Sequence, residues 1–438
     1  MFNKNILNHI KENSLIISFS FLIILNQLNY FRIKVADFVV FLPRTLSLIF
    51  LIFFFYKIIN ILFDNLKIDK KNLIYFILFF FQVFLSLIFI NEDFLSNKLT
   101  IRLFLIFNYE IIKFFFVYVF FCIIGAHLIN KKNLLLVFKI ILSLSYLVVF
   151  FGFVLFVNFH FTFFDLIERL FYYDDPSSVG YRFFSLFGEP RNAALFLITN
   201  ISILILIYKN FEKKIKLELY PYFIFFIIFS LIGFFLTKSF SGILALFFGF
   251  VFVFLFFIPQ VIQKKKDFRF YLNFILFSFL VIGFLFLALQ IDRVQDYANQ
   301  LKFYVFANEE ADDRLIAQFK DILPIVEYIK YLTNLEFKKI LFGNGSYSSY
   351  YFNDFEFAPP HSFFTRLIYD NGLFGFFLFS LFVFSSLSKN CKFIDKVLLS
   401  FVYGAFLAIN STFIFTFIMF MICIKKTYNN HKNLINKI

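Results

Sequence analysis

Long runs of apolar residues, separated by short polar stretches, dominate the chain. An α-helix of roughly 20 residues crosses a bilayer core of about 30 Å, and twelve runs reach or approach that length. They are 14–31, 46–63, 73–91, 104–129, 133–158, 191–208, 219–236, 240–260, 270–291, 362–386, 396–409 and 411–424. The last two share one apolar run, which is broken only by Asn410, Ser411 and Thr412. The pattern predicts an all-α polytopic membrane protein with about twelve transmembrane helices.

Composition supports the membrane class. Hydrophobic residues make up 61% of the 438 positions, and the mean hydropathy is +0.82. One soluble core of this length cannot bury so much apolar surface. Phe occurs 84 times and Trp not at all, which indicates a bias of the whole chain, so stripes of Phe carry no functional weight.

The distribution of Lys and Arg predicts the orientation. Short cytoplasmic loops retain positive charge, and with twelve spans nearly every basic cluster falls on one side, leaving both termini in the cytoplasm. The exception is the short stretch with Arg32, Lys34 and Arg44. The net charge of +14 is then mainly a sign of membrane orientation, and no nucleic-acid partner is expected.

Three regions follow from this topology. Residues 1–291 hold the first nine helices and an external loop near 159–190, residues 292–360 form a large external loop, and residues 361–438 hold three more helices and a cytoplasmic tail. The large loop has eleven acidic and seven basic residues, opposite in balance to the cytoplasmic side. The external side of the membrane is therefore the side with room for a polar site.

The large loop is expected to be partly helical. Apolar spacing predicts an amphipathic helix that starts near Asp312 or Asp313 and is bent or restarted at Pro324. Gly343, Asn344 and Gly345 predict a turn. A tyrosine strip follows, and its side chains suit either stacking on sugar rings or an ordinary membrane interface: Tyr347, Tyr350 and Tyr351.

His361 is the histidine best placed for chemistry, because it lies where the large loop meets a predicted span. Its alternative role is to cap that helix after Pro359 and Pro360. His160 is also external and is the rival base, but no charged residue is near it in sequence. His, Cys, Asp and Glu show no metal-ligand spacing. The three Cys fall in spans or on the cytoplasmic side, so no metal, cofactor or disulfide is expected.

Basic residues gather in the predicted external segments. Arg182 and Arg191 bracket Glu189 just before a span, and Lys238 lies in a short external turn. Arginine offers several fixed donors and a permanent charge, which suit a diphosphate. Arg314 and Arg366 could add to this cluster. The alternative is that these cations anchor the chain to membrane lipids, although positive charge on the external side opposes the usual bias.

Several of these segments resemble a known family. His361-Ser362, nine residues, then Gly372-x-x-Gly375 resembles the H-[N/S/Q]-x9-G-x-x-G motif of the O-antigen ligase and O-antigen polymerase superfamily. YRFFSLFGEP, TKSFSGILAL, DDRL and LFGNGSY are similar, in the same order, to further elements of that family. The resemblance covers roughly residues 179–375, and the first five spans match only in hydropathy.

The resemblance implies a metal-independent, inverting glycosyltransferase of the bacterial inner membrane, with its active site facing the periplasm. Its donor would be an undecaprenyl-diphosphate-linked oligosaccharide, and its acceptor another lipid-linked repeat unit for a polymerase or lipid A-core for a ligase. A chain-length regulator is a further candidate partner. His361 would be the base, Arg182, Arg191, Lys238 and Arg314 would bind the diphosphate, and Glu189 would orient an arginine. Ser362 and Arg366 would support them, and Gly372 and Gly375 would allow close helix contact.

Two positions depart from the family pattern. Phe240 stands where the family usually has arginine, so Lys238 would supply the charge, and Arg191 stands where the family often has Asn. The preferred function is repeat-unit polymerase, with ligase as the alternative. A polysaccharide or anion transporter is the alternative from another class, and it predicts charges at mid-membrane depth and repeated halves.

Overall fold

The computed structural model is a bundle of helices with one small β-hairpin. It describes residues 16–21, 32–35, 38–41, 70–86, 133–161, 182–187, 189–263, 323–345, 348–349, 362–385, 393–408 and a few single positions. The elements are β1 (Arg32–Val35), β2 (Phe38–Phe41), α3 (Lys70–Ser86), α7 (Leu134–Phe161), the 3-10 turn η3 (Ser185–Phe187), α10 (Pro190–Tyr208), α11 (Lys213–Thr237), α12 (Phe240–Gln263), α16 (Leu323–Thr333), α17 (Phe337–Phe342), α18 (Phe363–Ser385) and α19 (Phe393–Ala408).

The helices are those of a membrane protein. In the described part of the chain, four helices are long and apolar enough to cross a bilayer: α7, α10, α11 and α18. Helices α3 and α12 contain shorter apolar segments, and α19 coincides with another predicted span. The remaining predicted spans, 14–31, 46–63, 104–129, 270–291 and 411–424, lie wholly or largely outside the described residues, so the number twelve stays a prediction.

The described part of the chain is helical, as expected, except for one short hairpin. Strands β1 and β2 pair antiparallel, with Arg32 opposite Phe41 and Val35 opposite Phe38. In β1, Arg32 and Lys34 alternate with Ile33 and Val35, the period of two that a strand requires. The segment directly follows the first predicted span, 14–31.

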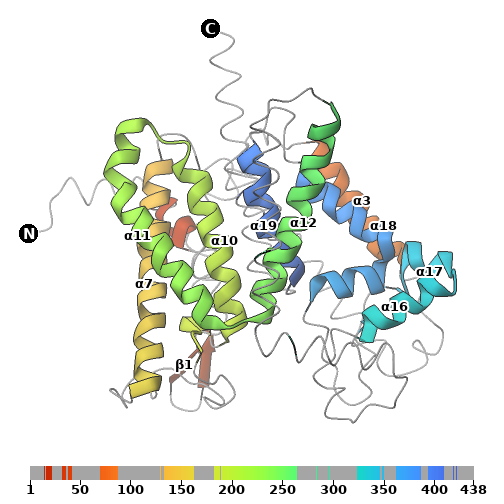
Figure 1. Ribbon diagram of the computed structural model, residues 1–438, viewed down its shortest axis with the longest axis horizontal. Helices are drawn as coiled ribbons and strands as arrows, with labels where there is room; N and C mark the ends of the chain where they lie inside the picture. The colour runs from red at the N-terminus through yellow and green to blue at the C-terminus, as the bar shows by residue number, and fades with distance from the viewer. Residues whose placement is uncertain are drawn as a thin grey trace, which may run out of the picture.

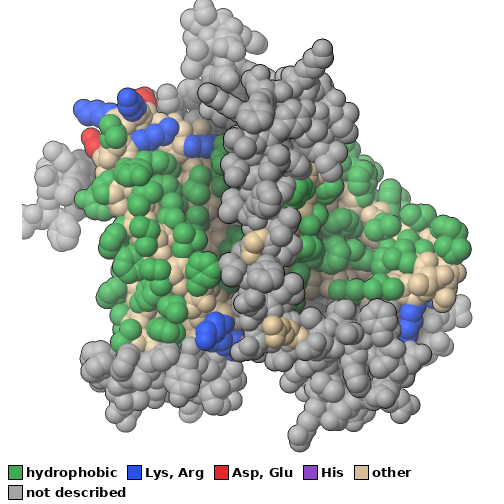
Figure 2. Space-filling model, in the orientation of Figure 1, with side chains coloured by type: hydrophobic (Ala, Val, Ile, Leu, Met, Phe, Trp, Pro, Cys, Tyr) green, Lys and Arg blue, Asp and Glu red, His purple; other side chains and the backbone are tan. Residues whose placement is uncertain are grey.

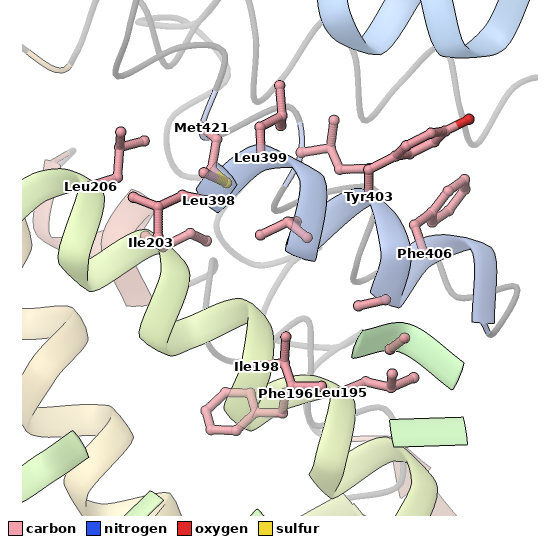
Figure 3. Close-up of a cluster of buried hydrophobic side chains, with 14 of the residues drawn as sticks. Leu195, Phe196, Ile198, Ile203, Leu206, Leu398, Leu399, Tyr403, Phe406 and Met421 are labelled. Atoms are coloured by element: carbon pink, nitrogen blue, oxygen red, sulfur yellow. The ribbon is translucent and has the colours of Figure 1, made fainter. Parts of the chain in front are cut away.

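Helix α10 lies at the centre of one half of the bundle (Figure 1). It contacts α7, α11, α12 and α19, and of the four spanning helices its apolar window is the most buried, whereas that of α11 is the most exposed. Ile203 of α10 lies beside Leu398 of α19 and Met421 in one apolar cluster, whereas Tyr403 points away from α10 (Figure 3). Apolar packing therefore fixes α10 against α19 in the interior of the bundle.

Helices α12 and α19 pack antiparallel at close range. Gly404 of α19 faces the backbone of Ala245 and Gly249 on α12, so a Cβ there would lie 2.5 Å from the Gly249 nitrogen. Further along, Tyr403 packs on Phe252 and Lys396 lies over the ring of Phe256. In a membrane the hydrophobic effect does not drive helices together, so their association depends on close packing. Small residues such as these glycines permit that close approach.

The second half of the bundle contains α3 and α18, which pack side by side, with α16 and α17 beside the first part of α18 (Figure 1). Pro324 lies in the first turn of α16, where its missing N–H costs no helical hydrogen bond. The predicted helix from Asp312 to this point lies outside the described residues. Tyr328 joins α16 to α17 through its hydroxyl, which donates to the Ile340 carbonyl at 2.8 Å, and burial raises the pKa of Tyr328 to about 12.

Charged side chains lie at the ends of α11 and not along its length (Figure 2). Lys213 and Lys214 are exposed where α11 begins, and Lys238 is exposed where it ends. At the first of these ends, Lys209 after α10 forms an ion pair with Asp395 in the first turn of α19. Apolar side chains cover the surface between the ends, as a helix facing lipid requires.

The contact between α12 and α19 gives a stability prediction. Gly404→Ala places a methyl group against backbone atoms that cannot move aside, so it should lower the stability of the purified protein in detergent by about 1–3 kcal/mol. Gly283→Ala is the control, because nothing lies within 4 Å of its added Cβ. Thermal unfolding of both variants should show a lower midpoint for Gly404→Ala alone; equal midpoints would contradict this packing.

Candidate functional site at one end of the bundle

The N-terminus of α10 holds Arg191 in a fixed orientation. Glu189 precedes the helix in an extended conformation, and Pro190 is its first residue. The Glu189 carboxylate accepts hydrogen bonds from Arg191 Nε, from Arg191 Nη2 at 3.0 Å and from Asn192 Nδ2 at 3.2 Å. About a third of each side chain in the ion pair is exposed, 29% for Arg191 and 33% for Glu189. Arg191 is thus oriented by a carboxylate and still accessible to an anion.

Arg182 lies beside the end of α11. The backbone N–H of Phe183 donates to the Leu236 carbonyl at 3.1 Å, and the buried Phe183 ring packs against Gly152 of α7 and Gly233 of α11. These contacts hold the segment that enters η3 across α7 and α11. Arg182 itself is partly exposed.

Lys238 stands between two helix ends. It caps α11 in the left-handed conformation, with φ 46° and ψ 40°, and the next residue, Ser239, accepts the Gly242 N–H at 3.3 Å in the first turn of α12. Ser239 is buried, whereas Lys238 is exposed. The backbone therefore turns sharply here and leaves the ammonium group outside the bundle.

These three cations lie at the same end of the helices. Helices α10 and α11 are packed neighbours joined by the short segment 209–212, so they run in opposite directions, and the start of α10 lies at the end of α11. Helix α12 starts there too. The arrangement gathers Arg182, Arg191 and Lys238 around one end of α10, as Figure 1 allows the reader to follow.

The start of α18 lies at the same end of the bundle, where Ser362 bonds to α19. The Ser362 hydroxyl donates to the Leu407 carbonyl at the end of α19 at 3.1 Å and accepts the Thr365 N–H at 3.3 Å, as a helix N-cap does. Because α19 runs antiparallel to α12, Leu407 lies near the start of α12. His361, the residue before Ser362, and Arg314 lie outside the described residues.

A second polar cluster lies within α18. Arg366 and Asp370 are both buried, 6% and 1% exposed, and Arg366 Nε lies 3.7 Å from Asp370 Oδ2. Asp370 Oδ1 also accepts the Ser349 N–H at 2.8 Å and the Ser348 hydroxyl at 3.1 Å, and Oδ2 accepts the Ser349 hydroxyl at 3.1 Å. Arg366 thus lies beside a buried carboxylate that the large loop also binds.

Helix α18 is broken next to this cluster, at Gly372. The backbone of Gly372 has φ 65° and ψ −172°, so the preceding carbonyls lose their helical partners. The N–H groups of Asn344 and Gly345 donate to the carbonyls of Tyr369 and Asp370 at 3.0 and 3.1 Å. A third carbonyl, that of Asn371, lies 3.5 Å from Nε2 of Gln82 on α3.

Gly372 and Gly375 therefore have different surroundings. A Cβ on Gly372 would meet the Leu341 carbonyl and lie 2.7 Å from the Gly343 nitrogen, so its close contact is with the turn after α17. A Cβ on Gly375 would lie 2.5 Å from Cβ of Asn371 on the same helix and only 3.9 Å, an ordinary contact distance, from Cγ of Gln82 on α3. The predicted turn at Gly343–Gly345 is present, with positive φ at both glycines.

Sequence reasoning did not identify Asp370, Ser348, Ser349 or Gln82. The spacing of Arg366 and Asp370, four positions apart, was the one available signal, since such residues share a helix face. Within the described residues, no group of three or more His, Cys, Asp and Glu lies together as a metal site requires.

Comparison with known proteins adds no assignment. No protein-family model, no curated protein and no solved structure matches the chain.

The break in α18 should depend on Gly372. Gly372→Ala combines an unfavourable positive φ with a clash against the backbone of Leu341, so it should cost about 1–3 kcal/mol or more. Leu373→Ala is the control, because Leu373 is 42% exposed. Thermal unfolding in detergent should show a marked loss for the glycine variant and a small one for the leucine variant. Equal losses would contradict the described break.

Proposed function

We propose that this chain is a membrane glycosyltransferase of the O-antigen polymerase and ligase type. It would transfer an undecaprenyl-diphosphate-linked oligosaccharide to an acceptor hydroxyl on the periplasmic face of a bacterial inner membrane. The observation that supports this most is the gathering of Arg182, Arg191 and Lys238 at the bundle end where Ser362, the neighbour of His361, begins α18.

The reaction follows from these residue types. His361 would accept the proton of the acceptor hydroxyl as its oxygen attacks the anomeric carbon, because imidazole is the side chain that most readily exchanges a proton near neutral pH. The bond from that carbon to the diphosphate oxygen breaks as the new glycosidic bond forms, with inversion. The diphosphate leaves with the electron pair and needs no general acid, because cations stabilise its charge.

Each cation has a distinct part in this proposal. Arg191, whose side chain is 29% exposed in its ion pair with Glu189, would bind the diphosphate through its guanidinium group. Lys238, exposed at the end of α11, would act as a point charge. Arg182 and Arg314 would complete the binding of the donor, which also contacts membrane lipids through its polyprenyl chain. Both chain termini would be cytoplasmic in a topology of twelve spans.

Polymerase is preferred, and the acceptor distinguishes it from the alternatives. A polymerase extends another lipid-linked repeat unit and could work with a chain-length regulator, whereas a ligase transfers the glycan once to lipid A-core. One observation favours a transporter instead: a broken helix with a buried ion pair, Arg366 with Asp370, also occurs where helices line a substrate path. The gathering of Arg182, Arg191 and Lys238 at one end of the bundle favours the enzyme.

The first test of this proposal is on His361. Purified protein in detergent is incubated with a polyprenyl-diphosphate-linked repeat unit, with and without lipid A-core. His361→Ala should lower the rate by about 10²–10⁴-fold through loss of the general base, and His160→Ala should leave it unchanged. A ladder of longer polyprenyl-linked glycans indicates a polymerase and a single product on lipid A-core a ligase. Equal rates for His361→Ala and wild type would reject His361 as the base, and no transfer by wild type would favour a transporter.

The donor site is tested separately on Arg191. Arg191→Ala should raise the KM for the donor and lower kcat/KM by about 10²-fold, as expected for the loss of a charged group that stabilises the leaving diphosphate. Arg191→Lys should recover only part of this, because lysine lacks the two-pronged donor geometry. Lys213→Ala removes an exposed charge at the opposite end of α11 and should change neither constant. Equal effects of Arg191→Ala and Lys213→Ala would reject the donor site at the start of α10.

A further inference from the structure

The first part of α18 is anchored at its beginning to the transmembrane bundle. The break at Gly372 sets off the segment Phe363–Asn371, here called the half-helix. Ser362 bonds to the Leu407 carbonyl at its start, and the Phe363 ring packs against Phe406 of α19, with 4.4 Å between ring centroids. The start of the half-helix therefore has little freedom to move relative to α19.

The other end of the half-helix is anchored to the large loop. The turn after α17 donates two backbone N–H groups to it, and the Asp370 carboxylate accepts three hydrogen bonds from Ser348 and Ser349. Tyr331 of α16 also stacks on Tyr369, with 6.5 Å between ring centroids. The contact is thus made by a charged side chain, by backbone and by an aromatic pair.

A buried carboxylate is a costly means of fastening a loop. Asp370 is 1% exposed, and replacing a buried ion pair by apolar residues often leaves stability unchanged or improved. The best attested use of such a group is to specify one register among several, because every other register leaves the charge without partners. Arg366, on the same helix, stays beside Asp370 wherever the loop lies. The three hydrogen bonds from Ser348 and Ser349 form only when the loop is in one position relative to the half-helix.

We infer that Asp370 is a positioning residue for the transfer reaction: by holding Ser348 and Ser349, it fixes the large loop relative to the half-helix that begins two residues after His361. This inference rests on the proposed function. In sequence, Ser348 and Ser349 stand between Tyr347 and Tyr350, two of the tyrosines suited to stacking on a sugar. The loop segment with these tyrosines would contact the acceptor, and His361 would activate the acceptor. Both would therefore be held by the half-helix.

The test separates positioning from donor binding. Ser348→Ala with Ser349→Ala keeps the Arg366 and Asp370 pair. It removes both hydroxyl bonds to Asp370, together with the bond of the Ser348 hydroxyl to the Gly345 carbonyl at 2.7 Å. Asp370→Asn removes the charge and leaves the bond to Gly345 in place. Misplacement of reacting groups by about 1 Å lowers rates by about 100-fold, so kcat should fall toward that extent. The KM for the donor should stay within about threefold, since the cations on α10 and α11 are untouched.

Two further variants make the result specific. Ser348→Thr with Ser349→Thr keeps both hydroxyls and should retain most of kcat. Ser202→Ala with Ser400→Ala is the matched control, because each of these buried hydroxyls donates to a carbonyl of its own helix, and it should leave kcat unchanged. If the double threonine variant were as slow as the double alanine variant, or the control equally slow, the inference would be overturned.

Trypsin cleavage at Lys338 and Lys339 reports on the loop independently of activity. Both are exposed in α17, and cleavage should be faster in the double alanine variant than in wild type. Faster cleavage with an unchanged kcat would overturn the positioning role, and unchanged cleavage would overturn the anchor itself. If wild type transferred nothing from a validated donor, the proposed function would fail and the positioning role with it, while cleavage would still show whether Asp370 holds the loop.

Discussion

Hydrogen bonding of the backbone at Gly372 is the constraint on which the rest of the structure depends. A helix in a membrane satisfies its own carbonyls, and a break leaves several without partners in a medium that supplies none. Here the carbonyls of Tyr369 and Asp370 receive N–H groups from the turn after α17, and Gln82 of α3 approaches that of Asn371. The break therefore exists only because a loop and a distant helix both pack against it.

This requirement brings the large loop into the bundle. Gly343 and Gly372 lie backbone to backbone, where a side chain on either would clash, and the same approach places Ser348 and Ser349 around Asp370. Arg366 completes the surroundings of the buried carboxylate. Charge, hydrogen bonding and close packing thus act at one place, which explains how a polar loop can have a defined position on an apolar helix.

The half-helix also connects the two polar clusters. Its start bonds through Ser362 to the end of α19, and α19 packs on α10 and α12, whose first residues lie beside Arg191 and Lys238. Its end carries Asp370 and the loop. In the proposed enzyme, the half-helix begins next to His361. It would lie between the cations that bind the donor and the large loop.

Local sequence determined the helices. The predicted spans 133–158, 191–208 and 240–260 differ from α7, α10 and α12 by three residues or fewer at either end, because an apolar run bounded by charge fixes where a helix enters and leaves the membrane. The turn at Gly343–Gly345 was also predicted, since glycines favour positive φ. The resemblance drew attention to Gly372, although a pattern of residues does not show whether a glycine breaks a helix. That break, the partners of Asp370 and the role of Gln82, 289 positions from Asn371, were decided by the tertiary structure alone, because the atoms that satisfy a freed carbonyl come from segments that only folding brings together.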